Sequence, residues 1–397
     1  MKVLMICNKS PYPAKEGGSI AMNAIIEGLL KSGHTVKVLA INTNKYFTDV
    51  EDVPTEYQKN TGLEFGYVDL SVKAVDAFQN LFTNKSYHVQ RFINKDFEHL
   101  IKHTLEENQY DVVQLETLFM APYVDVIRKN SKAKIVLRAH NIEHLIWSRI
   151  ARSTEGILKR KYIKHLARTL KIYELNILKE IDGIAAITHN DAVFFKEQAP
   201  DLKVVDIPFG VDADKYESYT AEGEFPSLCH IGAMNWIPNQ EGIEWFLKNV
   251  WDQIHVNHPA LHFYLAGREM PDHFYKMNYA NVDIVGEVPD ALEFIQSKSI
   301  MVVPLLSGSG IRVKIIEGMA MGKAVIASKI GAEGINYTDG VNILIANTPE
   351  EYAQAIKKCV NDQQFTEEIG RNARKLIRTE HHNAVLMEKL TAFYQSL

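Results

Sequence analysis

The chain has 397 residues, more than the roughly 250 to 300 at which a single hydrophobic core usually stops growing, and this length predicts two domains. A composition that is 46% hydrophobic and 23% charged is typical of a globular protein and excludes a disordered, collagen-like or low-complexity chain. The formal net charge of -5 provides no overall basic field, so nucleic acid is not expected as a partner.

Cysteine usage and the beginning of the chain favour the cytoplasm. Cys7, Cys229 and Cys359 are an odd number of widely spaced thiols, which argues against a disulfide framework. The first residues lack the apolar core and cleavage site of a signal peptide. No run approaches the roughly 18 apolar residues that a spanning helix needs. We therefore expect contact with a membrane, where there is any, only at its inner face.

The first half of the chain alternates short apolar runs with segments of helical length. Residues 2–7 and 35–41 are predicted strands on either side of an amphipathic helix that ends at Gly33, which makes an opening βαβ unit. Further strands are predicted at residues 112–115, 135–139 and 184–187. This alternation predicts an α/β fold with a doubly wound parallel sheet.

A second alternation follows a stretch rich in Pro, Gly and charge. It contains predicted strands at 228–231, 262–266, 282–285, 300–304, 325–327 and 343–345, and predicted helices at 239–254, 289–296 and 314–321. We predict two Rossmann-like domains facing a cleft. Their bounds are an N-terminal acceptor domain (1–205), a linker (206–226), a C-terminal donor domain (227–380) and a C-terminal helix (381–397), for which packing against the N-terminal domain is one option.

Two glycine-containing segments stand where helices begin after strands. Gly17 and Gly18 precede the first helix, where exposed backbone N–H groups favour a phosphate or sugar oxygen, although a simple turn explains them equally well. The segment from Ser307 to Gly310 leads into a helix that carries Arg312, Lys314 and Glu317. Two cations beside backbone N–H groups suit a diphosphate, and a carboxylate one turn later suits a ribose diol. The alternative is a solvated, amphipathic helix start.

Taken in order, several segments resemble the retaining glycosyltransferases of family 4, which have the two-domain GT-B fold. They comprise the opening strand with Gly17 and Gly18 and the segments 207–212, 229–232, 265–268, 284–288 and 304–326, and the resemblance extends over nearly the whole chain. It implies a donor site made of Gly17, Gly18, Gly232, Val285, Val288, Ser309, Gly310 and Glu317. In this site Glu317 would bind the donor ribose, and the backbone around residues 285–288 would frame the nucleotide base.

The chain departs from the family pattern at two places. Ser309 occupies the position of the first of the family's two glutamates, which puts the usual contact to the donor sugar hydroxyls in doubt. The family's Arg and Lys after the first strand of the second domain are also missing. We infer that Arg312 and Lys314 supply this positive charge and serve catalysis, since stabilising charge where it develops is commonly the largest catalytic contribution.

His140 follows the predicted strand 135–139, at the end of the strand where ligands bind in open sheets. It matches a histidine that the family places near the reacting sugar, and it is our third catalytic candidate, able to bond a sugar hydroxyl or to assist proton movement. Glu143 and His144 nearby have a spacing that suggests metal ligands, but no third ligand accompanies them. We therefore expect no metal and no other cofactor.

Residues 148–179 are strongly basic and carry apolar residues at helical spacing, which predicts a basic amphipathic helix. Its face would suit anionic lipids or an acceptor diphosphate, or it would simply cover the sheet. The favoured function is metal-independent transfer of a hexosyl or related group from a nucleotide sugar to a glycan or lipid-linked acceptor, in polysaccharide biosynthesis. A GT-B-like nucleotide-sugar epimerase and a noncatalytic nucleotide-sugar-binding protein remain alternatives.

Overall fold

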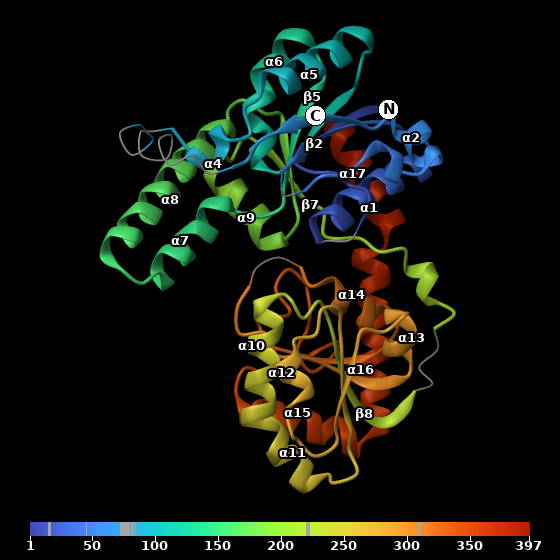
Figure 1. The fold of residues 1–397 in the computed structure, drawn as a ribbon. Coiled ribbons are helices and arrows are strands. Elements are labelled where there is room, and N and C mark those ends of the chain that lie inside the picture. The colour runs from blue at the N-terminus through green and yellow to red at the C-terminus, as the bar shows by residue number, and fades with distance from the viewer. Residues whose placement is uncertain are drawn as a thin grey trace. The chain divides into compact units, whose positions relative to one another are not determined.

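The computed structural model describes residues 1–14, 17–44, 46–71, 80, 83, 85–219, 223–308 and 311–397. They form two compact units (Figure 1). Unit 1 comprises Met1–Gly210 and Leu386–Leu397, and unit 2 comprises Val211–Val385. Each unit is built on one parallel sheet with helices packed against it, so the predicted pair of Rossmann-like domains is confirmed.

The change from unit 1 to unit 2 lies inside the predicted linker, between Gly210 and Val211. Regular structure extends further into that stretch than predicted, because a strand already begins at Glu224. The last part of the chain is divided between the units. Residues 381–385 remain in unit 2, whereas residues 386–397 pack in unit 1.

The sheet of unit 1 has the strand order β3-β2-β1-β4-β5-β6-β7. Its strands are β1 (Lys2–Cys7), β2 (Thr35–Thr43), β3 (Glu64–Val68), β4 (Val112–Glu116), β5 (Lys134–Ala139), β6 (Gly183–Ala186) and β7 (Lys203–Asp206). The sequence patterns predicted five of them. The two outermost strands, β3 and β7, were missed because edge strands with half-exposed, charged residues lack the continuous apolar run of a buried strand.

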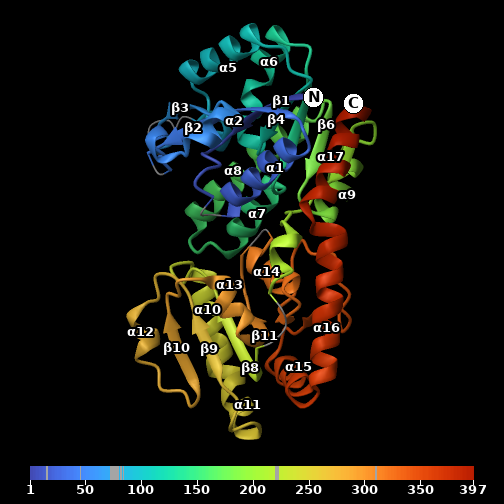
Figure 2. The same ribbon diagram turned by 90° about the vertical axis from the view of Figure 1, so that its right-hand side faces the viewer.

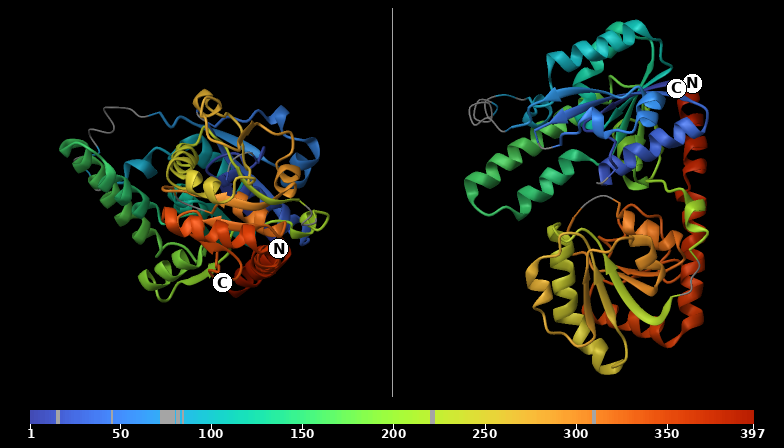
Figure 3. Two further views of the ribbon diagram at one scale, coloured as in Figure 1. Left: turned by 90° about the horizontal axis from the view of Figure 1, so that it is seen from below. Right: turned by 45° about the vertical axis from the view of Figure 1, so that its right-hand side comes forward.

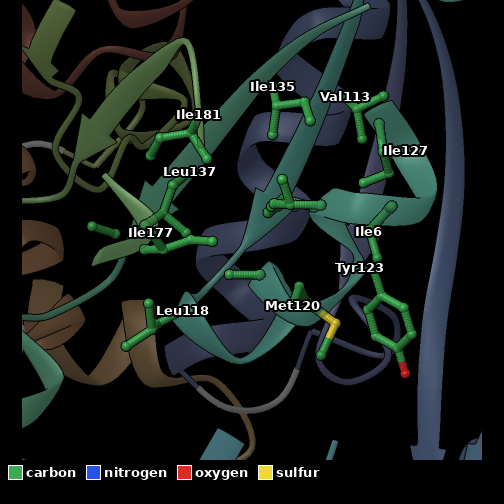
Figure 4. Packing of buried hydrophobic residues seen from close by; sticks show 14 of the residues in the cluster. Ile6, Val113, Leu118, Met120, Tyr123, Ile127, Ile135, Leu137, Ile177 and Ile181 are labelled. Atoms are coloured by element: carbon green, nitrogen blue, oxygen red, sulfur yellow. The ribbon is translucent and has the colours of Figure 1, made fainter. Parts of the chain in front are cut away.

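The helices of unit 1 follow the strands in alternation. Among the residues that the structure describes, they are α1 (Gly17–Lys31), η1 (Val50–Asp52), α2 (Thr55–Thr61), α4 (Tyr87–Gln90), α5 (Lys95–Glu107), η2 (Leu118–Tyr123), α6 (Val124–Asn130), α7 (Glu143–Ser153), α8 (Ile157–Ile177) and α9 (His189–Gln198). Both faces of the sheet are buried, since alternate side chains of each strand point to opposite faces. On β1, Leu4 and Ile6 join the core shown in Figure 4, whereas Val3 and Met5 join the core on the opposite face.

The C-terminal helix α17 (Asn383–Ser396) completes that second core (Figure 2). Its residues Leu386, Met387, Leu390, Phe393 and Tyr394 are buried there with β1 and α1. The approach is close, because a Cβ atom at Gly28 of α1 would lie 2.7 Å from Met387 Cγ.

The predicted basic helix over residues 148–179 is in fact two helices. α7 and α8 form an antiparallel hairpin that extends away from the sheet of unit 1 (Figure 3). The chain turns at Gly156, whose φ of +84° lies in the left-handed region that glycine adopts readily. Within the part of the chain that the structure describes, no helix combines the length and apolar character needed to cross a membrane.

The sheet of unit 2 has the strand order β10-β9-β8-β11-β12-β13. Its strands are β8 (Glu224–Ile231), β9 (Phe263–Ala266), β10 (Val282–Gly286), β11 (Lys298–Val303), β12 (Ala324–Ala327) and β13 (Leu344–Ile345). All six agree with the predicted strands to within a few residues.

The helices of unit 2 cover this sheet. They are η3 (Ala213–Tyr216), α10 (Ile237–Phe246), the π-helical η4 (Leu247–Trp251), α11 (Asp252–Asn257), α12 (Asp272–Tyr275), α13 (Ala291–Gln296), α14 (Val313–Ala320), α15 (Pro349–Asn361), α16 (Gln363–Leu376) and the π-helical η5 (Ile377–His381). The single helix predicted at 239–254 is the continuous run α10, η4 and α11.

Each sheet has one place where the chain changes direction along the strand order. In unit 1 this switch point lies between β1 and β4, and in unit 2 it lies between β8 and β11. Loops that leave two neighbouring strands in opposite directions open a crevice at such a point, and ligands of open α/β sheets bind there.

Candidate functional site

Three of the predicted residues lie on the segment that follows β11 at the switch point of unit 2. This segment leads into α14, for which Arg312 is the N-cap residue in extended conformation. Ile315, Ile316 and Met319 bury one face of this short helix against the sheet. Burial of that face turns Lys314 and Glu317 toward the carboxyl end of the sheet, where a ligand would bind.

Lys314 is held by two residues from the segment that begins with β8. Its Nζ donates to Asn239 Oδ1 at 2.8 Å and to His230 Nε2 at 3.0 Å. His230 Nδ1 lies 2.8 Å from the carbonyl oxygen of Val302, which can only accept, so Nδ1 carries the proton and Nε2 accepts from the lysine. Asn239 is fixed in turn, because its Nδ2 donates to the carbonyl of Ala233 at 2.8 Å.

This arrangement changes the protonation of both partners. Burial, and then the charge of Lys314, hold the pKa of His230 well below its usual value, so the ring is neutral. Burial, and then the charge of Arg312, lower the pKa of Lys314 to about 7. Among the described residues only two of the three ammonium N–H groups are engaged, and the third is available to an anion.

Gly232 lies directly after β8 and makes room for this network. A Cβ atom at this position would lie 2.7 Å from Lys314 Nζ and 2.8 Å from Asn239 Nδ2. The residue was predicted to approach the donor. In the structure its small size has a second effect, since any side chain would displace the lysine.

Arg312 is only 7% exposed and packs near an aromatic ring. Its guanidinium carbon lies 5.2 Å from the ring centre of Trp236, a cation–π distance. A Cβ atom at Gly308, whose φ is +116°, would come within 2.8 Å of Arg312 Nη2 and 3.1 Å of the Trp236 ring. Glycine at position 308 therefore permits both the backbone conformation and the packing of the arginine.

Glu317 lies one turn after Lys314 on α14 and faces a tyrosine from η3. Tyr216 Oη donates to Glu317 Oε1 over a long distance of 3.5 Å. Burial raises the pKa of Glu317 to about 7, and the tyrosine only partly offsets this effect. A carboxyl group with one weak partner suits a ligand hydroxyl pair, as predicted for a ribose.

The remaining donor candidates of unit 2 are more scattered. Val285 is exposed at the end of β10, and Val288 is half-buried in the loop after that strand. In the sheet, β9 lies between β10 and β8. Ser309 and Gly310 lie outside the described residues. The structure thus brings Gly232, Arg312, Lys314 and Glu317 to one switch point, whereas Val285 and Val288 lie at the edge of the sheet.

In unit 1, Gly17 and Gly18 begin α1, the helix that follows β1 at the switch point. A Cβ atom at Gly17 would meet nothing within 4 Å, and one at Gly18 would meet only the flexible end of Lys9. Among the described residues, little therefore occupies the space beside these two glycines. Such an opening is compatible with a ligand and is also what a solvated turn would have.

His140 follows β5, and it pairs with a buried carboxylate of the neighbouring strand. His140 Nε2 lies 2.7 Å from Glu116 Oε2 at the end of β4. Gln114 donates to the other oxygen, Glu116 Oε1, at 2.5 Å, and Tyr394 of α17 donates to Gln114. Arg138, the register partner of Glu116, is also buried and compensates its charge. Because Nε2 is engaged by Glu116, Nδ1 is the ring nitrogen of His140 with which a substrate could form a hydrogen bond.

Sequence reasoning assigned no role to His230, Asn239, Gln114 and Glu116. One signal was present for the last two, because polar residues inside a strand as buried as β4 need partners. The pairing of His230 and Asn239 with Lys314 joins residues 84 and 75 positions apart. No local pattern reports such a pairing.

The second His–Glu pair in unit 1 has a structural environment. His144 Nδ1 lies 2.5 Å from Glu174 Oε2, and the backbone N–H groups of Glu143 and His144 donate to the same carboxylate. Glu174 thereby satisfies the N-terminus of α7. Among the described residues, no group of three or more His, Cys, Asp or Glu side chains is arranged to hold a metal ion.

Residues 225–362 match the model of the family described as glycosyl transferases group 1. Over 96% of both chains, the protein is 22% identical to an uncharacterized 44.6 kDa protein in cps region of Klebsiella pneumoniae. The fold resembles Anabaena Alr3699/HepE, solved in complex with UDP (TM-score 0.67, 15% identity, 100% of both chains). It also resembles sucrose-phosphate synthase from Thermosynechococcus elongatus (TM-score 0.69, 15% identity, 100% of this chain and 99% of the other).

The two Rossmann-like units and their similarity to these structures define the GT-B fold. The group 1 domain lies on unit 2 and includes β8, β11 and α14, and with them Gly232, Arg312, Lys314 and Glu317. The protein is a glycosyltransferase with the GT-B fold.

Proposed function

We propose that this glycosyltransferase moves a sugar from a nucleoside diphosphate sugar to an acceptor hydroxyl with retention of configuration, in glycan or glycolipid assembly. Retention is what the resemblance to family 4 implies. The relative in cps region supports a role in polysaccharide biosynthesis. The UDP in the Anabaena structure makes a uridine diphosphate sugar the first donor to test.

The observation that carries this proposal is the held ammonium of Lys314. A mobile lysine side chain loses rotamer freedom when it binds an anion, whereas the side chain of Lys314 is already oriented by His230 and Asn239. A preorganised cation at the start of a helix stabilises the negative charge that develops on the departing diphosphate.

Each remaining candidate has a specific role in this proposal. Arg312 is the second cation for the diphosphate, and Glu317 accepts hydrogen bonds from the ribose hydroxyls. His140, oriented by Glu116, contacts the acceptor or the transferred sugar through its other ring nitrogen. The acceptor hydroxyl attacks from the side of the leaving group, which then takes up the proton of the hydroxyl.

The reaction is proposed to need no metal ion, because Arg312 and Lys314 provide the positive charge that a divalent cation would otherwise supply. The protein is proposed to be cytoplasmic and to contact the inner face of the membrane through the hairpin of α7 and α8. Basic residues on that hairpin would attract anionic lipids.

The proposal is tested first by thermal unfolding in the presence of UDP, GDP and their sugar conjugates, because a ligand that binds the folded state raises its stability. A nucleotide sugar that raises the melting temperature is then incubated with and without candidate acceptors. Transfer to an acceptor is expected. Conversion of the donor without an acceptor would indicate an epimerase instead, and failure of every nucleotide sugar to bind would overturn the proposed function.

A further inference from the structure

A pocket of about 270 Å3 lies between the two helices of the α7–α8 hairpin in unit 1. From α7 it is lined by His144, Ser148, Ala151 and Arg152, and from α8 by Lys164, Ala167, Arg168 and Lys171. The small side chains of the two alanines leave room for the pocket between the helices, and longer polar side chains surround this room. This pocket belongs to neither switch point.

The lining has a strongly one-sided charge. Arg152, Lys164, Arg168 and Lys171 contribute four cations, and no carboxylate lines the pocket. Glu174, which bonds the lining residue His144, is buried and already accepts from two backbone N–H groups and the His144 ring. The negative charge of Glu174 is thereby compensated inside the hairpin and does not neutralise the cations of the pocket.

The four cations are exposed and have no partner among the described residues. No side-chain hydrogen bond or ion pair joins any of them to another residue of the described chain. Lys164 and Arg168 are four residues apart on α8, and Arg168 and Lys171 are three apart, so these like charges are neighbours on one face of the helix and repel one another. Such an arrangement is stabilised by a multivalent anion, and a phosphate or diphosphate group accepts from several cations at once.

The tip of the same hairpin indicates where this anion comes from. Ile157 and Leu158 are 74% and 83% exposed at the start of α8. The next residues, Lys159, Arg160 and Lys161, are exposed as well. Exposed aliphatic residues followed by cations are the pattern of a segment that rests in the interfacial region of an anionic membrane.

We propose that the pocket between α7 and α8 binds the phosphate or diphosphate group of a lipid-linked acceptor, while the Ile157–Leu158 tip contacts the membrane that holds the lipid. The acceptor role rests on the proposed function. The binding of a phosphate group in the pocket does not depend on it.

Farnesyl diphosphate is the probe, since it is a soluble lipid diphosphate, and farnesol and inorganic pyrophosphate are the comparisons. Calorimetric titration of the full chain is carried out with excess UDP, so that diphosphate binding at unit 2 does not contribute. We compare the pocket variant Arg168→Gln/Lys171→Gln with the matched variant Lys159→Gln/Lys161→Gln, which removes two cations of α8 outside the pocket. Circular dichroism melting checks that both variants fold.

The wild-type chain is expected to bind farnesyl diphosphate much more tightly than farnesol. The pocket variant should lose this affinity by about tenfold or more, and the matched variant should stay within about twofold. Equal losses in both variants would indicate a diffuse basic surface and overturn the pocket. Unchanged affinity in the pocket variant would overturn it as well.

Two further measurements separate the possible sources and functions. If the pocket variant binds phosphatidylglycerol vesicles more weakly than the wild type but keeps its affinity for farnesyl diphosphate, the pocket holds a phospholipid headgroup and the acceptor assignment is wrong. UDP affinity should be equal in all three proteins. A wild-type protein that does not bind UDP would overturn the proposed function but would leave the result for farnesyl diphosphate unchanged. The Arg312→Ala variant, in which the donor site is impaired, should bind farnesyl diphosphate as the wild type does.

Discussion

Lys314 is the residue whose charge depends most on its surroundings. Its pKa is lowered to about 7, so the free protein increasingly carries a neutral amine as the pH rises above this value. A bound diphosphate favours the ammonium form, and binding above pH 7 must therefore take up a proton. We expect the affinity for UDP to fall between pH 7 and pH 9, by at most about tenfold per pH unit for one linked proton.

Calorimetry in buffers of different ionisation enthalpy measures this proton uptake. Glu317 also titrates near pH 7, so the Glu317→Gln variant provides the background in which Lys314 is observed alone. Asn239→Asp places a carboxylate beside the ammonium and should move the fall in affinity to higher pH. An affinity that does not change with pH in the Glu317→Gln background would show that Lys314 does not contact the diphosphate.

For Arg312 we predict that it binds the diphosphate part of the nucleotide. Because Arg312 is proposed to pair with the diphosphate and not with the base or ribose, Arg312→Ala should weaken UDP by about 1.5 to 3 kcal/mol and leave uridine almost unchanged. Both affinities are measured by calorimetry. Equal losses for the two ligands would exclude the phosphate assignment and indicate that the variant disturbs Trp236 instead.

At the scale of elements, the hairpin of α7 and α8 shows how one residue alters a prediction. Apolar spacing over residues 148–179 indicates a single helix, and Gly156 divides it. The division turns one basic stretch into two facing helices, with a pocket between them and an exposed tip at Ile157 and Leu158. The composition of the stretch is unchanged, but its cations now surround a defined space.

The tip is expected to hold the protein at anionic membranes. Replacing Lys159, Arg160 and Lys161 by Gln should reduce binding to phosphatidylglycerol vesicles by roughly 3 kcal/mol, at about 1 kcal/mol for each cation near the surface. Sedimentation with vesicles at low salt measures this loss, and binding should weaken as salt rises. The control replaces Lys95, Lys129 and Lys132, which are exposed elsewhere on unit 1. Wild-type protein that stays wholly in the supernatant would exclude the membrane role.

At the scale of the whole molecule, the proposed chemistry draws its positive charge from side chains. Transfer should therefore persist at an unchanged rate in excess EDTA, measured by release of nucleoside diphosphate in the presence of acceptor. Activity that disappears with EDTA and returns with Mg²⁺ or Mn²⁺ would contradict this prediction. A parallel assay of the Arg312→Ala variant, expected to be strongly impaired, shows that the measured release depends on the site.

Much of the architecture follows from local patterns in the chain. Buried parallel strands are continuous apolar runs, so β1, β2, β4, β5, β6 and all the strands of unit 2 are visible in the sequence. Arg312, Lys314 and Glu317 are equally visible, because all three lie within six residues at the start of one helix. The two-domain α/β fold and the grouping of these three side chains at the start of one helix were therefore predictable.

Only the tertiary structure decided how the candidate side chains are held. His230 and Asn239 orient Lys314, and Glu116 orients His140, across strands and loops that are distant in sequence. The end of the chain is the clearest case, since Tyr394 reaches Gln114 beneath the His140 site. Periodicity reports which face of an element is buried, whereas a hydrogen-bond partner depends on strand order and register, which arise when the whole sheet has formed.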